Sequence, residues 1–483
     1  MSNDNLKKKV FSNLIWKFAE RILAQGVSLI VSIVLARILL PEAYGIVAMI
    51  MVFINIANVF VTSGFGSSLI QKKDADEKDF STIFYCSFTI SIVIYGILFL
   101  VSPLIAEFYN TPQLTPVLRV FGLKIIISSF SSIQHAYVSK HMMFRKFFFS
   151  TLFGTVFSGI VGIVLAMNGF GVWALVAQYL TNTVVDAIVL LFTVHWRPRL
   201  MFCMKSAKEL MSFGWKMLAA SLIGTIFNNL RSLVIGKFYT KDDLAYYSKG
   251  KNFPDLITNN VVASISSVLF PVLSDADKDK VVVKQMTRRS VKTSSYVVFP
   301  LLAGLAAVAE PLTILLLTDK WAGSIIYMQL ICIYSALHTV TEANMQSMIA
   351  MGRSDTILKL EFIKKPVGIA LVLLAARHSV LAVGISLPVY SVFSMLVNMF
   401  PNRSIIDYKY REQLADLLPA TLLAGVMFTV TYLISFCEMS YFIMLPLQIL
   451  VGVVVYVGLS VVTKNETFSY LLGFIKRNLF RKK

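Results

Sequence analysis

The sequence predicts an all-α, polytopic membrane protein with about 14 transmembrane helices, and two properties of the chain support this fold class. Of its 483 residues, 57% are hydrophobic and only 15% are charged, with a mean hydropathy of +0.72. One water-soluble core cannot hide so much apolar surface. The apolar residues also form stretches of roughly twenty, the length that a helix needs to cross the hydrocarbon core. The chain is therefore expected to use the bilayer as its solvent.

The individual helices follow from the lengths of these apolar stretches. Short segments rich in Gly, Pro or charged residues separate one stretch from the next. We expect one transmembrane helix in each stretch. The stretches cover residues 11–39, 44–66, 80–106, 114–138, 147–167, 171–194, 209–239, 244–273, 292–317, 321–350, 356–376, 379–400, 415–437 and 440–463.

The distribution of Lys and Arg predicts the orientation of the helices. Loops on the side of the amino terminus carry most of the 45 Lys and Arg residues, whereas the opposite loops hold only Lys237, Lys241, Lys320 and Arg377. Cytoplasmic loops retain positive charge, so both termini are expected in the cytoplasm. The formal net charge of +19 is spread over many short loops. This spread argues against a nucleic-acid-binding surface.

Residue types that often serve catalysis or metal binding are scattered along the chain. The four cysteines have no CxxC spacing, and the five histidines form no HExxH pattern. We therefore predict neither a metal site nor a cofactor. The outer loops are short and contain no acidic catalytic pair, which disfavours a membrane polymerase or ligase of lipid-linked sugars. The sequence predicts a protein that is not an enzyme and acts through its helices.

An internal repeat predicts two similar halves. The segment ARILLPEAYGIVA, from Ala36, aligns without a gap with GKFYTKDDLAYYS, from Gly236. Both combine a basic residue at the end of a long apolar helix, an acidic short turn, and a small residue in the next helix. We expect six-helix lobes at 1–200 and 201–402, related by an axis along the membrane normal, with a central cavity between them. Residues 403–483 are predicted to form two additional helices and a basic cytoplasmic tail.

Polar side chains on one side of several helices predict what lines this cavity. In the first helix, polar residues that include Lys17 and Arg21 fall within an arc of about 140°. Packing between helices explains any single Ser or Asn. One-sided polar faces on five helices instead favour a shared cavity, and its excess of Lys and Arg favours phosphate or carboxylate. The predicted substrate-binding residues are Lys17, Arg21, Gln25, Asn55, Asn58, Lys124, Asn228, Arg231 and Lys249.

Several segments also resemble a known family. These are ARILLPEAYG at 36–45, SGFGSSLIQKKD at 63–74, AEFYNTPQLTPVLRV at 106–120, GFGVWALVAQ at 169–178, HWRPRL at 195–200 and AMGRSDTILK at 350–359. They resemble the polysaccharide-transporter branch of the multidrug/oligosaccharidyl-lipid/polysaccharide (MOP) exporter superfamily, and within it the Wzx-type O-antigen or colanic-acid flippases. The family pattern usually has Gly before the Pro of the first turn, where this chain has Leu40.

The resemblance implies a flippase of the bacterial inner membrane. Such a protein moves an undecaprenyl-pyrophosphate-linked oligosaccharide to the periplasmic leaflet by alternating access, for lipopolysaccharide or other surface polysaccharide biosynthesis. Lipid-linked oligosaccharide, membrane lipids, and the polysaccharide polymerase and chain-length machinery are the implied partners. We expect Arg21, Lys124 and Arg231 to receive the pyrophosphate. No covalent step is needed, because the barrier to flipping is desolvation of the head group.

Two other transport functions stay open. A cation-coupled small-molecule exporter of the multidrug kind would use an acidic cavity, and Glu20 and Glu342 are candidate ion-coupling residues. The excess of positive charge argues against this function. A scramblase or channel is the other alternative.

Overall fold

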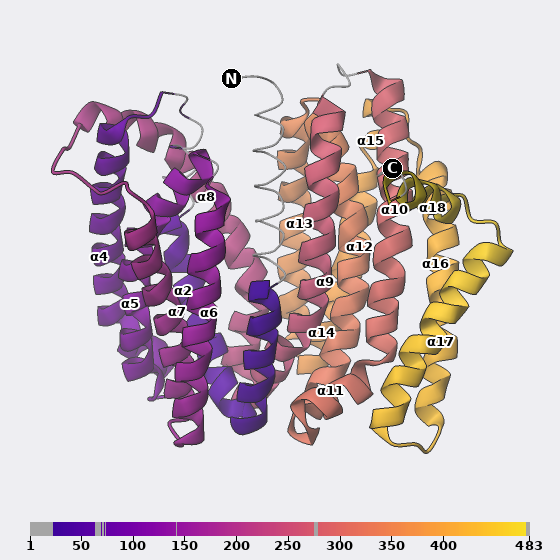
Figure 1. The fold of residues 1–483 in the computed structure, drawn as a ribbon, viewed down its shortest axis with the longest axis horizontal. Coiled ribbons are helices and arrows are strands. Elements are labelled where there is room, and N and C mark those ends of the chain that lie inside the picture. Colours follow the sequence, from indigo (N-terminus) through magenta and orange to yellow (C-terminus); the bar gives the residue numbers. More distant parts are fainter. Residues whose placement is uncertain are drawn as a thin grey trace. The chain divides into compact units, whose positions relative to one another are not determined.

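The computed structural model describes residues 23–62, 69, 72, 74–141, 143–274 and 279–479, with the backbone alone at 144, 145, 209, 213, 261–274 and 474–479. Every regular element in these ranges is a helix, which confirms the predicted all-α fold (Figure 1). The chain divides into two compact units, Met1–Ala245 and Tyr246–Lys483. The lobes predicted at 1–200 and 201–402, with the C-terminal part at 403–483, remain a prediction.

The first unit consists of long helices joined by short turns. A capping box between Asp76 and Asp79 starts α4, and Asn110, with φ of +50°, forms the turn after α4. Gly171, with φ of +53°, directly precedes α7. The helices are Leu23–Ile38, α2 (Pro41–Thr62), α4 (Glu77–Phe108), α5 (Leu114–Lys140), α6 (Phe144–Met167), α7 (Val172–Thr193) and α8 (Met204–Phe238), followed by the first residues of α9 (Lys241–Ser274).

The second unit contains the rest of α9 and a further series of helices. In this unit, charged side chains link α10 to α16 through hydrogen bonds. Arg288 donates from Nε and Nη2 to the two carboxylate oxygens of Asp416, at 2.7 and 2.9 Å, and the Tyr408 hydroxyl donates to the same carboxylate at 2.8 Å. The helices are α10 (Lys280–Ala307), α11 (Ala309–Leu317), η1 (Asp319–Ser324), α12 (Ile325–Ala350), α13 (Ser354–Ala375), α14 (Val380–Met399), α15 (Asn402–Ile405), α16 (Tyr410–Leu433), η2 (Ile434–Phe436), α17 (Tyr441–Val462) and α18 (Glu466–Leu479).

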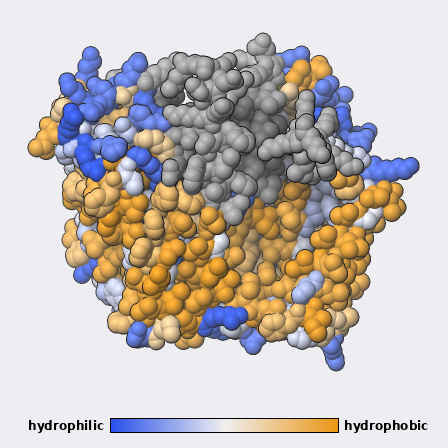
Figure 2. Space-filling view, viewed as in Figure 1, coloured by the Kyte–Doolittle hydropathy of each residue, from blue (hydrophilic) through white to orange (hydrophobic). Residues whose placement is uncertain are grey.

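Eleven segments of the described chain are long and apolar enough to cross a membrane. A helix lies at each of the fourteen predicted positions, but three of these helices are not among the eleven, so the count of 14 stays a prediction. These three are Leu23–Ile38, α9 and α13. The charged residues Glu361, Lys364 and Lys365 lower the mean hydropathy of α13; Glu361 pairs with Lys364 at 2.5 Å and with Lys365 at 3.6 Å. Figure 2 shows apolar residues over most of the visible described surface.

The helix boundaries repeat with the offset that the sequence indicated. The helices before the two matching turns end at Ile38 and Phe238, and the next helices begin at Pro41 and Lys241. The residues that precede α6 and α13, Met143 and Arg353, share one backbone conformation, with φ −97° and ψ 50°, although they do not have this offset. These agreements are consistent with the predicted repeat, and the two six-helix halves remain a prediction.

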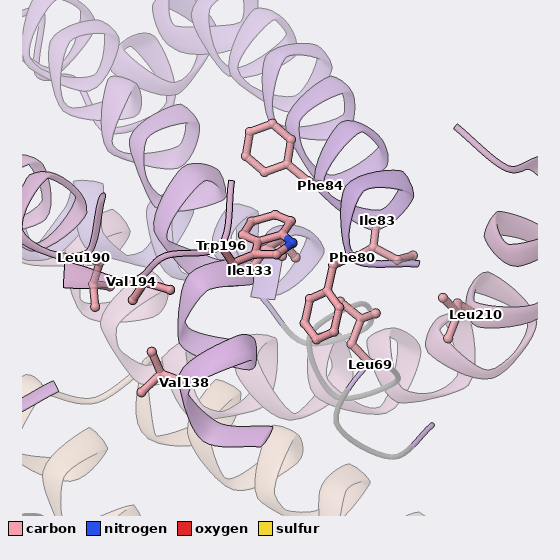
Figure 3. Close-up of a cluster of buried hydrophobic side chains, with 10 residues drawn as sticks. All are labelled: Leu69, Phe80, Ile83, Phe84, Ile133, Val138, Leu190, Val194, Trp196 and Leu210. Atoms are coloured by element: carbon pink, nitrogen blue, oxygen red, sulfur yellow. The ribbon is translucent and has the colours of Figure 1, made fainter. Parts of the chain in front are cut away.

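An apolar cluster holds the connection between α7 and α8 against the start of α4 (Figure 3). Trp196, only 5% exposed, packs with Phe80 and Phe84. After Trp196, the backbone N–H of Arg199 donates to Ser81 Oγ at 3.2 Å, and that of Cys203 donates to Thr82 Oγ1 at 3.1 Å. This connection is therefore part of the core of the first unit.

Candidate functional site

The structure describes most, but not all, of the predicted site residues. Lys17, Arg21 and Glu20 lie outside the described residues. Six other predicted residues belong to the first unit, whereas Lys249 and Glu342 belong to the second. In the first unit, Gln25 lies on Leu23–Ile38, Asn55 and Asn58 on α2, Lys124 on α5, and Asn228 and Arg231 on α8.

Polar side chains follow the contact between α5 and α7. The Lys124 ammonium lies 5.5 Å from the centroid of the Tyr179 ring and 5.8 Å from that of Phe121. Further along the same helices, His135 Nε2 and Asp186 Oδ2 are 2.9 Å apart. A cation above an aromatic face and a His–carboxylate pair both lower the cost of polar groups inside apolar helices. The structure thus brings Lys124 and His135 to one polar helix contact.

The sequence analysis missed Tyr179 and Asp186. Asp186 is the sole charged residue in α7. A single carboxylate in an otherwise apolar span signals a function or a buried partner. The partner, His135, is 51 residues away in the chain and could be identified only from the fold.

Predicted residues on α2 and α8 include one buried side chain and one buried amide oxygen. Arg231 on α8 is 5% exposed. On α2, the Asn58 Oδ1 atom is buried and accepts no hydrogen bond from any described residue. Asn55 is half-buried and Asn228 exposed. A buried guanidinium and a free amide oxygen are groups that phosphate oxygens and sugar hydroxyls respectively can bind.

In the second unit, the two predicted residues, Lys249 and Glu342, each contact another polar or aromatic side chain. Lys249 is 4% exposed, and its ammonium lies 5.3 Å from the centroid of the Trp321 ring. On α12, His338 Nε2 lies 3.6 Å from Glu342 Oε1, one turn apart on the same helix. Among the described residues, no cluster of three His, Cys, Asp or Glu side chains could hold a metal ion.

The first unit also contains a pocket of about 430 Å³ that the sequence analysis did not identify. The start of α2, the turn between α4 and α5, and the turn between α8 and α9 form it. These turns belong to the end of the helices that carries few basic residues. An ion pair of 2.8 Å between Glu42 and Lys241 joins two of these elements. Desolvation, followed by the nearby carboxylates of Glu42 and Asp243, raises the pKa of Asp242 above its ordinary value.

Two features keep this end of the unit tightly packed. Gly45 lies so close to the backbone of Lys241 that a β-carbon at this position would stand 2.6 Å from the Lys241 carbonyl carbon. The Lys237 ammonium donates to the Phe108 carbonyl at 2.5 Å and lies 4.2 Å from the centroid of the Phe108 ring. The two turns that carry the sequence repeat therefore contact each other directly.

Comparison with known proteins finds relatives that are named for the biosynthesis of surface polysaccharides. The chain matches the model of a family described as "Polysaccharide biosynthesis protein" over residues 34–326. It is 24% identical over 315 residues to the succinoglycan biosynthesis transport protein ExoT of Rhizobium meliloti, covering 65% of this chain and 64% of the relative. It is 23% identical over 425 residues to the lipopolysaccharide biosynthesis protein WzxC of Escherichia coli, covering 86% of this chain and 85% of the relative.

A third relative is the teichuronic acid biosynthesis protein TuaB of Bacillus subtilis, 22% identical over 428 residues, with 86% of this chain and 88% of the relative covered. Among solved structures, the lipid II flippase MurJ in an inward closed conformation has the same fold, with a TM-score of 0.78, 17% identity and coverage of 95% of this chain and 100% of MurJ. An inward-facing multidrug transporter of the MATE family has a TM-score of 0.62, 14% identity and coverage of 81% and 98%. Because the family model covers more than half of the sequence, this chain belongs to the polysaccharide biosynthesis protein family.

Proposed function

We propose that this protein is a flippase that moves undecaprenyl-pyrophosphate-linked oligosaccharides across the bacterial inner membrane for surface polysaccharide biosynthesis. The observation that carries the proposal is the family match over residues 34–326. Two further findings support it: ExoT is named as a transport protein, and the fold is that of a protein named as a lipid II flippase. Both termini are proposed to lie in the cytoplasm. Lipid-linked oligosaccharide and membrane lipids are the proposed partners, together with a polysaccharide polymerase and its chain-length machinery.

In this proposal, basic residues compensate the pyrophosphate for the water that it loses inside the membrane. A charged side chain at membrane depth costs at least ~2.5 kcal/mol, so it is retained where it faces protein or a watery cavity. Lys124 and Arg231 lie on candidate spans of α5 and α8, and they are proposed to face such a cavity. Together with Arg21, they are proposed to bind the pyrophosphate as two six-helix lobes alternate between inward and outward access.

The remaining predicted residues are assigned to the sugars and to coupling. The amides of Asn55, Asn58 and Asn228 are proposed to meet sugar hydroxyls, because an amide both donates and accepts hydrogen bonds. Further proposed contacts to the head group come from Lys17, Gln25 and Lys249. Glu20 and Glu342 are the candidates for ion coupling.

A cation-coupled small-molecule exporter is the second candidate function. The likeness to the MATE-family transporter, with a TM-score of 0.62, favours it. Cationic drugs require an acidic cavity, whereas the described residues assigned to the site bring three basic residues, Lys124, Arg231 and Lys249, against one carboxylate, Glu342. The flippase is therefore the function that the residues support better.

The test uses Lys124→Ala and Arg231→Ala in a strain that lacks the chromosomal gene. We expect each variant to reduce translocation of lipid-linked oligosaccharide about tenfold or more, because a hydrogen bond to a charged group contributes about 1.5–3 kcal/mol. Surface polysaccharide and accumulated lipid-linked intermediates are measured at equal protein levels. The matched control is Lys359→Ala, an exposed lysine of α13.

The result also separates the two candidate functions. Normal polysaccharide export by both variants would refute the roles of Lys124 and Arg231. Unchanged export in the deletion strain, combined with increased sensitivity to cationic drugs, would refute the flippase and support the exporter.

A further inference from the structure

We propose that the pocket of the first unit is a saccharide-binding subsite, which contacts the sugars of the substrate at the end of the helices opposite the basic loops. The inference rests on the proposed flippase function and adds a ligand class to a pocket that the proposed pyrophosphate site does not include. The volume of about 430 Å³ lies within the range of about 300–1,000 Å³ that is usual for small-ligand sites. The pocket therefore has room for a sugar residue.

Carboxylates supply the hydrogen-bond acceptors that sugar hydroxyls need. Glu42 and Asp242 both line the pocket. Lys241 binds Glu42 through Oε1 at 2.8 Å, while Asp242 is an exposed carboxylate whose nearest acidic neighbours are Glu42 and Asp243. An ionised carboxylate accepts up to about four hydrogen bonds and donates none. A neutral ligand that brings several donors, such as a sugar, stabilises this crowding of negative charge.

Aromatic side chains give the pocket its apolar surface. Tyr109, Phe238 and Tyr239 come from two different turns and line the same space. Sugar rings have apolar C–H faces, which bury well against aromatic rings. Tyr109 is 6% exposed, and its hydroxyl has no hydrogen-bond partner among the described residues. Edge-to-face contacts with Phe53 and Phe108 hold the Tyr109 ring, so this residue gives the pocket a fixed aromatic surface.

The turn that carries Tyr109 is held in place before any ligand arrives. Asn110 has φ of +50°, and Thr111, itself buried, donates from Oγ1 to the Tyr109 carbonyl at 3.1 Å. A site that is already ordered loses less entropy on binding. The pocket is thus suited to recognise a ligand rather than to fill with side chains.

The contacts of the two lysines in the pocket indicate whether its ligand is a sugar or an anion. Lys237 and Lys241 also line the pocket, but Lys237 is bound to the Phe108 carbonyl and ring, and Lys241 is paired with Glu42. The two ammonium groups share the pocket with the carboxylates of Glu42 and Asp242, so the lining has no net positive charge that would favour a phosphate. The described residues of the pocket also lack a third metal-ligating group, so a metal ion is not the expected ligand. The neutral sugar part of the substrate remains.

The experiment measures binding of a free oligosaccharide to the full-length protein in nanodiscs. The probe is the repeat unit released by mild acid from the lipid-linked intermediates of the producing strain, so that it carries neither lipid nor pyrophosphate. Saturation-transfer NMR and calorimetry are expected to detect binding to the wild type. Asp242→Asn and Tyr239→Leu are each expected to weaken it about tenfold. Glu107→Gln, an exposed carboxylate at the end of α4 outside the pocket, is the matched control and should bind as the wild type does.

The outcomes distinguish this inference from the proposed function. The inference is overturned if the wild type does not bind the free saccharide or if both variants bind it as tightly as the wild type does. It is also overturned if inorganic pyrophosphate competes with the saccharide for the same site. Flipping of lipid-linked oligosaccharide by the same preparations is measured separately. A wild type that flips its substrate without binding the free saccharide would leave the flippase intact and remove the subsite. A wild type that binds the saccharide at this pocket but flips no lipid-linked oligosaccharide would keep the saccharide-binding subsite and refute the flippase function.

Discussion

Gly45→Ala is expected to destabilise the first unit through a steric conflict that the structure locates. The added β-carbon would lie 2.6 Å from the carbonyl carbon of Lys241, 3.0 Å from its Cα, and closer still to its carbonyl oxygen. Normal carbon contacts begin at about 3.5 Å, so the two backbones must separate by roughly 1 Å. Because the neighbouring atoms belong to the backbone, no change of rotamer can relieve the overlap.

The magnitude follows from this overlap. Overpacking of a tight contact costs about 1–3 kcal/mol. The same shift would stretch the Glu42–Lys241 ion pair, now 2.8 Å long. With a change in Tm of about 2–4 °C per kcal/mol for a unit of this size, the expected decrease in Tm is about 2–12 °C.

Thermal unfolding of the purified protein in one detergent, followed by intrinsic fluorescence, measures the effect. The control is Gly96→Ala in α4, where an added β-carbon meets no heavy atom within 4 Å. This substitution should leave Tm unchanged or raise it slightly, since Ala favours a helix over Gly by about 1 kcal/mol. If Gly45→Ala melts at or above the wild-type temperature while Gly96→Ala behaves as expected, the steric reasoning is refuted.

Three further predictions test other contacts. Asp416→Ala removes both hydrogen bonds from Arg288 and should lower stability by about 2–3 kcal/mol, so an unchanged Tm would contradict a structural role. Since the pKa of Asp242 is raised in the folded protein, its ionised form opposes folding above that pKa, and the penalty disappears as the pH falls below the ordinary value of an aspartate. Asp242→Asn should therefore raise Tm at pH 7 and lose this advantage near pH 4; an advantage that grows on acidification would have the wrong sign. His135→Gln and Asp186→Asn, alone and combined, should show a coupling of about 0.5–1 kcal/mol in a double-mutant cycle, and additive effects would contradict a direct contact between the two side chains.

Much of the helical fold could be predicted because the bilayer imposes simple requirements on composition and length. Apolar stretches of about twenty residues marked the helices from α2 to α17, and the repeat fixed the turns before Pro41 and Lys241. The helix α18 was missed because it is short and amphipathic. Its Phe468 and Leu471 pack against a cluster that contains Tyr296, a contact that no span-length criterion detects.

The candidate site was less predictable because its contacts join distant parts of the chain. Periodicity showed that Lys124 lies on a polar helix face, but it could not show that Tyr179 of α7 covers it. The repeat likewise identified the turns containing Glu42 and Lys241 as similar. It could not show that these turns, 199 residues apart, form an ion pair with each other and enclose a pocket.

The anchoring of Trp196 has a practical consequence for work with this protein. Residues 194–203 look like a spacer between two groups of helices, the kind of segment at which a chain is usually cut, lengthened or fused to a reporter. Here an insertion would expose an indole that is 5% accessible and would break the bonds from Arg199 and Cys203 to Ser81 and Thr82. A split version expressed as two fragments would leave the first fragment without the segment that closes its own interior. Tags and insertions are better placed at turns whose side chains are exposed, such as the one that contains Glu438.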